Sequence, residues 1–159
     1  MSAIMAPISK GTWFLLGAVA VFIAVGMNLN PVHAEETSNA LFQQAVDRLS
    51  NSDPMERRKA AAELGHLRDK MAVPHLLKAL SDSNPYVRGN VAYSLGKIKS
   101  SEAVPELMKI VGNDPAPHVR RIAAAALSRI RDLRAVRVLI GGLDDSDVGV
   151  GYACAEALG

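Results

Sequence analysis

The sequence predicts an all-α fold: a right-handed α-solenoid of about three and a half stacked helix pairs, preceded by an N-terminal signal or anchor helix. Three observations predict it. A block of 31 or 32 residues recurs along the chain, apolar residues inside each block follow helical spacing, and the segment before the blocks is apolar and uncharged. The hydrophobic fraction of 49% over 159 residues is sufficient for a packed core.

The first predicted element is the apolar segment at residues 11–32, which carries no charge and follows Lys10. A positive residue, an apolar run and a small residue such as Ala34 at its end are typical of a secretory signal peptide. We therefore expect residues 1–34 to be a signal peptide cleaved after Ala34. The alternative is an uncleaved anchor that crosses the inner membrane once. In both cases Lys10 on the inner side predicts that residues 35–159 lie in the periplasm or another extracytoplasmic compartment.

The rest of the chain repeats itself. The first halves of the blocks begin with Pro54-Met55-Glu56-Arg57, Pro85-Tyr86-Val87-Arg88, Pro117-His118-Val119-Arg120 and Val148-Gly149-Val150-Gly151. The second halves share Ala72-Val73-Pro74, Ala103-Val104-Pro105 and Ala135-Val136-Arg137. We therefore divide the domain at 35–159 into a half repeat (38–52), three repeats (53–83, 84–115 and 116–146) and a partial repeat (147–159).

Small and apolar residues recur at steps of three and four within each half. The columns of the first halves are Ala60/Val91/Ala123/Cys154, Ala61/Ala92/Ala124/Ala155 and Leu64/Leu95/Leu127/Leu158, and those of the second halves include Val73/Val104/Val136 and Leu76/Leu107/Leu139. Such steps place a column on one face of a helix, and the strict alternation of a strand is absent from the sequence. Each block is therefore a helix pair that buries its apolar face only by stacking on its neighbours.

Residues at the block boundaries fit helix ends. The predicted N-caps are Asp53, Asn84 and Asp147 for the first helices, and Asp69, Ser100 and Asp132 near the second ones. Pro54 and Pro85 suit the first position of a helix, where a missing N–H costs least. We expect the left-handed residues that end the first helices to be Gly65 and Gly96.

This pattern resembles HEAT repeats, in particular the short bacterial subclass called phycobilisome-lyase-like HEAT repeats. The resemblance is carried by Val87-Arg88, Val91-Ala92-Tyr93-Ser94-Leu95-Gly96 and Ala103-Val104-Pro105-Glu106-Leu107, and it covers about residues 38–159. It implies an armadillo-like α-solenoid that serves as a scaffold or adaptor. The chain departs from the pattern with Gly151 in place of the repeated Arg, Ser128 in place of Gly and Arg137 in place of Pro.

Composition and motifs argue against most kinds of chemistry. A net charge of +2 disfavours a dedicated nucleic-acid binder, and a single cysteine excludes a multi-cysteine metal site. His66, His75 and His118 fall at different slots of the repeat, so we expect no metal and no cofactor. Some HEAT-repeat hydroxylases hold two irons through His-Glu dipeptides, and this sequence contains none. We interpret Cys154 as a small buried residue, with a thiol for a bilin or a redox partner as the alternative.

Two sets of polar residues recur at the repeat spacing. The first is a predicted structural ladder made of Arg57, Arg88, Arg120, Asp82, Asn113 and Asp145. We expect it to hydrogen-bond backbone and neighbours along the stack, with an anion-binding stripe as the alternative. The second is a candidate protein-binding face on the second helices, made of His75, Lys78, Glu106, Lys109, Ile110 and Arg137. An ordinary solvated helix face is the alternative reading of this set.

We therefore expect a non-catalytic protein–protein interaction scaffold, exported to the periplasm. Its partner is a protein, nucleic acid is not a partner, and it meets a membrane only through the N-terminal segment if that segment is uncleaved. Two alternatives remain open: a bilin lyase or isomerase-like enzyme, as the name of the resembling subclass suggests, and a membrane-tethered scaffold.

Overall fold

The computed structural model describes residues 31–159, and every regular element in this range is helical. The chain divides into two units, residues 1–43 and 44–159, and the repeats lie in the second. The predicted signal or anchor therefore lies outside the described residues, except for its last four, which belong to helix α2 (Pro31–Arg48). Ala34, the predicted cleavage site, lies in this helix. No helix within 31–159 is long and apolar enough to cross a membrane.

Three helix pairs and a further helix follow α2. The first helices are α3 (Pro54–Leu67), α5 (Pro85–Ile98), α7 (Pro117–Ile130) and α9 (Val148–Leu158), and the second helices are α4 (Val73–Ala79), α6 (Val104–Asn113) and α8 (Val136–Gly141). A short 3₁₀ turn precedes each second helix, at Lys70–Ala72, Ser101–Ala103 and Leu133–Ala135, and another follows α8 at Gly142–Asp144.

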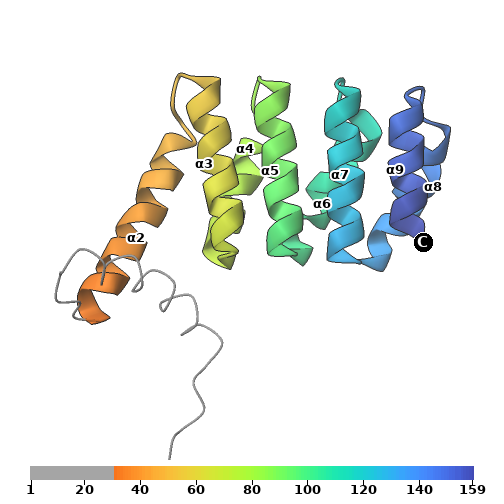
Figure 1. The fold of residues 1–159 in the computed structure, drawn as a ribbon. Coiled ribbons are helices and arrows are strands. Elements are labelled where there is room, and N and C mark those ends of the chain that lie inside the picture. The colour runs from red at the N-terminus through yellow and green to blue at the C-terminus, as the bar shows by residue number, and fades with distance from the viewer. Residues whose placement is uncertain (1–30) are drawn as a thin grey trace, which may run out of the picture. The chain divides into compact units, whose positions relative to one another are not determined.

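The helix pairs stack in register. In residues 44–159, α3, α5, α7 and α9 lie side by side in one layer, with α4, α6 and α8 behind them (Figure 1). Each second helix packs on the first helix of the next pair, as α6 does on α7. The predicted core columns are buried, with Leu64 and Leu95 at 0% exposure and Leu127 at 2%. The predicted fold class, a solenoid of helix pairs, is confirmed.

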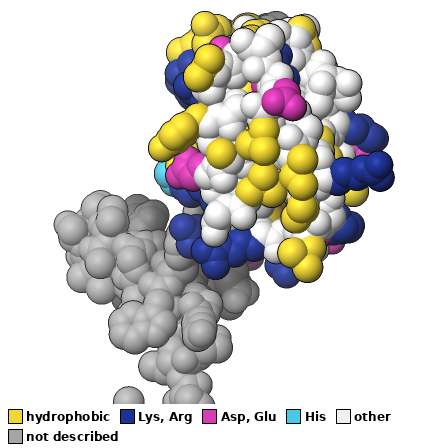
Figure 2. Space-filling model, turned by 90° about the vertical axis from the view of Figure 1, so that its right-hand side faces the viewer, with side chains coloured by type: hydrophobic (Ala, Val, Ile, Leu, Met, Phe, Trp, Pro, Cys, Tyr) yellow, Lys and Arg dark blue, Asp and Glu magenta, His cyan; other side chains and the backbone are white. Residues whose placement is uncertain are grey.

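The outer face of α8 and α9 is apolar (Figure 2). Leu158 exposes 37% of its surface, although its counterparts Leu64 and Leu95 expose none. Val148 and Tyr152 of α9 expose 87% and 73%. Leu158 thus occupies a core column of the earlier repeats and is open to solvent on this face, where it lies with the exposed Val148 and Tyr152.

The residues that cap the starts of the first helices agree with the prediction, whereas the left-handed residues that end these helices differ from it. Asp53, Asn84 and Asp147 do cap α3, α5 and α9 by accepting backbone N–H groups. Asp69 and Asp132 cap the 3₁₀ turns, whereas Ser100 makes no side-chain cap hydrogen bond. The left-handed residues are Arg68, Lys99 and Arg131, with φ of 54°, 57° and 59°.

Gly65 and Gly96 therefore lie inside their helices, and the prediction that they end α3 and α5 is wrong. Both glycines face the next repeat at close range. A Cβ on Gly65 would overlap Ser94, and a Cβ on Gly96 would lie 2.8 Å from the Cα of Ala126. These glycines allow two first helices to approach each other, which is a packing role and not a helix stop.

Candidate functional site

The arginine column forms a buried ladder along the loops that join successive repeats. The guanidinium of Arg57 donates two hydrogen bonds to the carboxylate of Asp82, at 2.6 and 2.8 Å. Arg120 does the same to Asp145, at 2.8 and 2.7 Å. The side chains in these pairs are at most 13% exposed. Paired and bidentate, they are held as structural groups and are not available to bind a free anion.

The middle pair of the ladder differs from the prediction. Arg88 donates to Asp114, at 2.7 and 2.8 Å, whereas Asn113 donates its amide to the carbonyl of Lys109. The second repeat has one residue more than the first, so a count of 31 from Asp82 stops one residue short. Asp82 stands three residues before Pro85, and Asp114 stands three residues before Pro117, so the two aspartates occupy the same position relative to the next first helix. Asn113 is therefore not a member of the ladder.

Two of the three ladder aspartates, Asp82 and Asp114, serve two repeats. The carboxylate of Asp82 binds Arg57, while its backbone carbonyl accepts a hydrogen bond of 2.9 Å from Arg88. Asp114 relates to Arg88 and Arg120 in the same way, with 2.8 Å between its carbonyl and Arg120. The ladder is therefore continuous, and it fixes the distance between one loop and the next.

The ladder also sets the protonation of its carboxylates. Hydrogen bonds from Arg57 and Arg120 lower the pKa of Asp82 and of Asp145 below the usual value. Burial is the largest single influence on Asp114 and would raise its pKa, but the hydrogen bonds from Arg88 and from the Ala116 N–H, together with the charge of Arg88, outweigh burial, so the net direction of the pKa is downward. All three carboxylates thus stay ionised at a lower pH than an ordinary aspartate does.

The residues of the predicted binding face lie on the three second helices. His75 and Lys78 belong to α4, Arg137 belongs to α8, and α6 carries Glu106, Lys109 and Ile110. Lys109 bridges to Glu106 at 2.7 Å, with both side chains largely exposed, so this pair contributes little to stability. Lys78 and Arg137 are exposed and His75 is half-buried.

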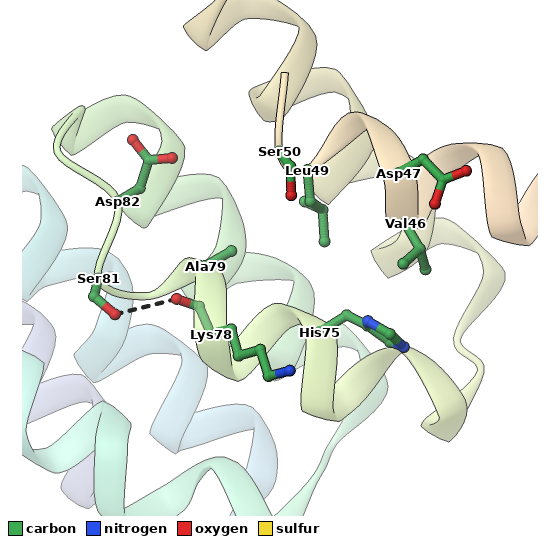
Figure 3. Close-up of a pocket in the computed structure, with 9 residues that line it drawn as sticks. All are labelled: Val46, Asp47, Leu49, Ser50, His75, Lys78, Ala79, Ser81 and Asp82. Atoms are coloured by element: carbon green, nitrogen blue, oxygen red, sulfur yellow. Dashed lines mark hydrogen bonds between the residues drawn. The ribbon is translucent and has the colours of Figure 1, made fainter. Parts of the chain in front are cut away.

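A first hollow lies between the last turn of α2 and helix α4 (Figure 3). It measures about 400 Å³ and contains His75 and Lys78 of the predicted face. Its other wall is Val46, Asp47, Leu49 and Ser50, and Ala79, Ser81 and the ladder residue Asp82 close it. Sequence reasoning did not select the α2 side of this hollow, although residues 41–46 stand at the repeat spacing from the second helix.

A second hollow of about 320 Å³ follows one repeat later, between α4 and α6. It contains Glu106, Lys109 and Ile110 of the predicted face. Leu77 and Leu80 give it an apolar wall, and the ladder pair Arg88 and Asp114 lies at its side together with Ser81, Asn113 and Pro115. The structure thus distributes five of the six predicted residues over two neighbouring hollows, while Arg137 lines neither.

Cys154 is fully buried, as predicted for its column. Burial raises the pKa of its thiol, which keeps the sulfur protonated and poorly nucleophilic at neutral pH. A Cβ placed on Gly142 would lie 2.5 Å from the Sγ of Cys154, so the thiol fills the contact between the 3₁₀ turn Gly142–Asp144 and α9. Within residues 31–159 no group of three or more His, Cys, Asp or Glu side chains is arranged to hold a metal ion.

Solved structures share this architecture. The structure of human deoxyhypusine hydroxylase in complex with glycerol is 23% identical, with a TM-score of 0.67, over 81% of this chain and 46% of that one. The complex of CpcE and CpcF of phycocyanin lyase from Nostoc sp. PCC7120 is 24% identical, with a TM-score of 0.61, over 75% of this chain and 78% of that one. The chain thus spans less than half the length of the hydroxylase. At these identities the likeness concerns the fold.

No curated protein sequence matches the chain. A family profile described as HEAT repeats does match it, over residues 42–128 and 105–159. These ranges cover the repeats, the ladder and both hollows. The chain therefore belongs to the HEAT repeat family.

Proposed function

We propose that this protein is a non-catalytic scaffold that binds a protein partner along its second helices. The observation that carries the proposal is the pair of hollows, one of about 400 Å³ between the end of α2 and α4, and one of about 320 Å³ between α4 and α6. They are related by the repeat, and each contains a lysine, Lys78 in one and Lys109 in the other. Extended surfaces of this kind serve binding in repeat proteins.

The lining of the hollows suggests the chemistry of the partner. Lys78 is the exposed cation of the first hollow and can pair with an acidic group of the partner, whereas Ile110, Leu77 and Leu80 favour an apolar side chain in the second hollow. Packed helices lie about 10 Å apart, a distance that an extended chain covers in about three residues. An extended segment with an acidic residue and an apolar residue about three positions apart fits this arrangement.

Two features support a binding role over a catalytic one. The thiol of Cys154 is buried, and the charged groups of the hollows are exposed or already paired, as Lys109 is with Glu106. Exposed or paired groups of this kind suit recognition more than proton transfer.

The test is affinity capture from an envelope fraction with the full chain, followed by titration of the captured partner. The variant Lys78→Glu/Lys109→Glu should lose capture because it places repulsive charge in both hollows. The matched control is Lys59→Glu/Arg121→Glu, which reverses two exposed cations on the first helices, one of them bridged to Glu56 at 2.7 Å as Lys109 is to Glu106. Equal capture by wild type and the hollow variant would refute the proposed face.

We also propose that the repeats work outside the cytoplasm, on the basis of the apolar segment at residues 11–32 behind Lys10. Mass spectrometry of the N-terminus tests this. A chain that begins at Glu35 supports export with cleavage, and an intact start in the membrane fraction supports the tethered scaffold instead. A soluble cytoplasmic protein that retains residues 1–34 would contradict both.

A second candidate function is bilin transfer, because the chain shares its fold with the phycocyanin lyase complex over 78% of that chain. Incubation of the protein with a bilin and an acceptor chain tests this candidate. Covalent attachment of the bilin to the acceptor would replace the scaffold proposal with an enzymatic one.

A further inference from the structure

We infer that the edge formed by the turns between first and second helices docks on an anionic lipid bilayer. This basic edge is defined by Arg68, Lys70, Lys97, Lys99, Arg129 and Arg131. It lies at the opposite end of the first helices from the ladder, and it goes beyond the partners predicted from the sequence. The lower margin of Figure 2, where these turns lie, carries dark blue and yellow side chains together.

The cations of the basic edge recur with the repeat. Lys97 and Arg129 occupy one slot in the last turns of α5 and α7, and Arg68, Lys99 and Arg131 occupy the slot directly after each helix. Because the first helices lie side by side, the turns form a row with a spacing of about 10 Å. Clusters of four to eight Lys and Arg are what anionic lipid surfaces attract.

The backbone at these positions gives a second, independent argument. Arg68, Lys99 and Arg131 are left-handed, a conformation that glycine adopts without strain and that other residues adopt at a cost. Cations in the last turn already complement the helix dipole, as Lys97 does in α5, so dipole stabilisation does not require a basic residue at the left-handed site. Three times the chain places a long cation where glycine would give the more stable turn, which indicates that the charge itself is used.

Exposed apolar side chains beside these cations favour a lipid surface over other polyanions. Leu133 exposes 87% of its surface, Met71 66% and Leu67 36%, all three in or next to the turns. Basic residues mixed with exposed apolar ones are typical of surfaces that enter the headgroup region, where both are satisfied. Nucleic acid or an acidic peptide would leave these apolar side chains in water.

The acids of the edge do not cancel its charge. Asp69, Glu102 and Asp132 lie in the same turns, but Asp69 and Asp132 act as caps that accept backbone N–H groups. Asp132 is also bound by Arg134, at 2.6 Å. The six cations of the basic edge thus outnumber the acids, although the whole chain carries a net charge of only +2.

A probe on the edge tests the inference in the full chain. Met71→Cys creates an exposed thiol for an environment-sensitive fluorophore, and the native Cys154 is buried, so labelling is selective. On vesicles of equal parts phosphatidylcholine and phosphatidylglycerol, the fluorescence emission of the probe should shift to the blue and be quenched by brominated lipids. On vesicles of pure phosphatidylcholine neither change should occur. The same probe at Lys109→Cys, on the second helices, should respond to neither. The edge probe reports contact of the turns whichever way residues 1–34 interact with the vesicle.

The decisive variant is Arg68→Gly/Lys99→Gly/Arg131→Gly. It should keep or raise the melting temperature, because glycine suits the left-handed sites. The edge probe of this variant should need on the order of 100-fold more anionic lipid to reach half of its maximal response, about fivefold for each lost cation. Lys78→Glu/Lys109→Glu, which disables the proposed protein-binding face, should leave the edge response intact, so the two proposals can fail separately. An unchanged lipid response in the glycine variant, or an edge probe that responds to DNA or polyglutamate but not to anionic vesicles, would overturn the inference.

Discussion

Replacement of Arg88 by methionine should destabilise the stack far more than the loss of an exposed lysine. The Arg88 guanidinium donates two hydrogen bonds to Asp114 at 2.7 and 2.8 Å, and two to the carbonyls of Asp82 and Ser83 at 2.9 and 3.3 Å. The side chains of Arg88 and Asp114 are only 12% and 3% exposed. Methionine keeps much of the apolar stem and removes all four bonds, which leaves the Asp114 carboxylate buried with the backbone N–H of Ala116.

The magnitude follows from that geometry. Breaking a fully buried ion pair costs about 3–5 kcal/mol, and the residual exposure of Arg88 lowers this to about 2–4 kcal/mol. That is a large share of the roughly 5–15 kcal/mol by which a domain is usually stable. Because the ladder holds two neighbouring loops, the loss should appear as one cooperative destabilisation.

Denaturant unfolding of the full chain, followed by helical circular dichroism, measures this loss. Lys109→Met is the matched control, since its bridge to Glu106 is exposed, and it should change stability by less than about 0.5 kcal/mol. The double variant Arg88→Met/Asp114→Leu should recover part of the loss, because it no longer buries an unpaired carboxylate. The ladder does not stabilise the stack as we argue if Arg88→Met has the same free energy of unfolding as Lys109→Met. The same holds if the double variant loses as much stability as the two single variants together.

Three further predictions concern the core and the pH dependence. Leu95→Ala should cost about 2–5 kcal/mol, because Leu95 is fully buried in α5, and a melting curve that matches wild type would contradict the repeat register. Gly96→Ala should cost about 1–3 kcal/mol by overpacking, since its Cβ would meet the Cα of Ala126 at 2.8 Å; higher stability would show that α5 and α7 can separate freely. The lowered pKa of Asp114 means that the folded chain binds fewer protons than the unfolded one. The stabilisation is complete above the unfolded pKa of about 3.9 and is lost as pH falls toward the lower folded value. The melting temperature should therefore fall less steeply from neutral to acid pH in Arg88→Met/Asp114→Leu than in wild type. Equal slopes would contradict the assignment of this pH dependence to Asp114.

Local patterns predicted the fold well, because each helix pair is specified by its own spacing and caps. Asp53 and Asn84 stand directly before a proline, and that pair of residues alone indicates a helix start. Gly65 and Gly96 were misassigned because the reason for their identity is a neighbour one repeat away, which no local pattern reveals. The left-handed residues are instead basic ones, which turn propensity alone would not choose.

The candidate face was predicted only in part, for a related reason. Helical spacing predicts which side chains of α4 and α6 point away from the core, and it therefore identifies Lys78 and Lys109 as residues of the candidate face. The hollows themselves depend on the distance between second helices and on side chains from the preceding element, such as Val46 and Leu49. Asp114 was missed because an inserted residue shifts the count, and aligning the blocks on their prolines would have found it.

The shared aspartates of the ladder give the stack unequal mechanical strength at its two margins. Along the loops, directional hydrogen bonds run without interruption from Arg57 to Asp145, so this margin resists elongation. Along the turns, neighbouring repeats are joined by single exposed hydrogen bonds, such as that from Arg134 to the Ser101 carbonyl. A force that stretches the stack should therefore separate the turns before the loops. The repeats should rotate relative to one another about an axis near the ladder.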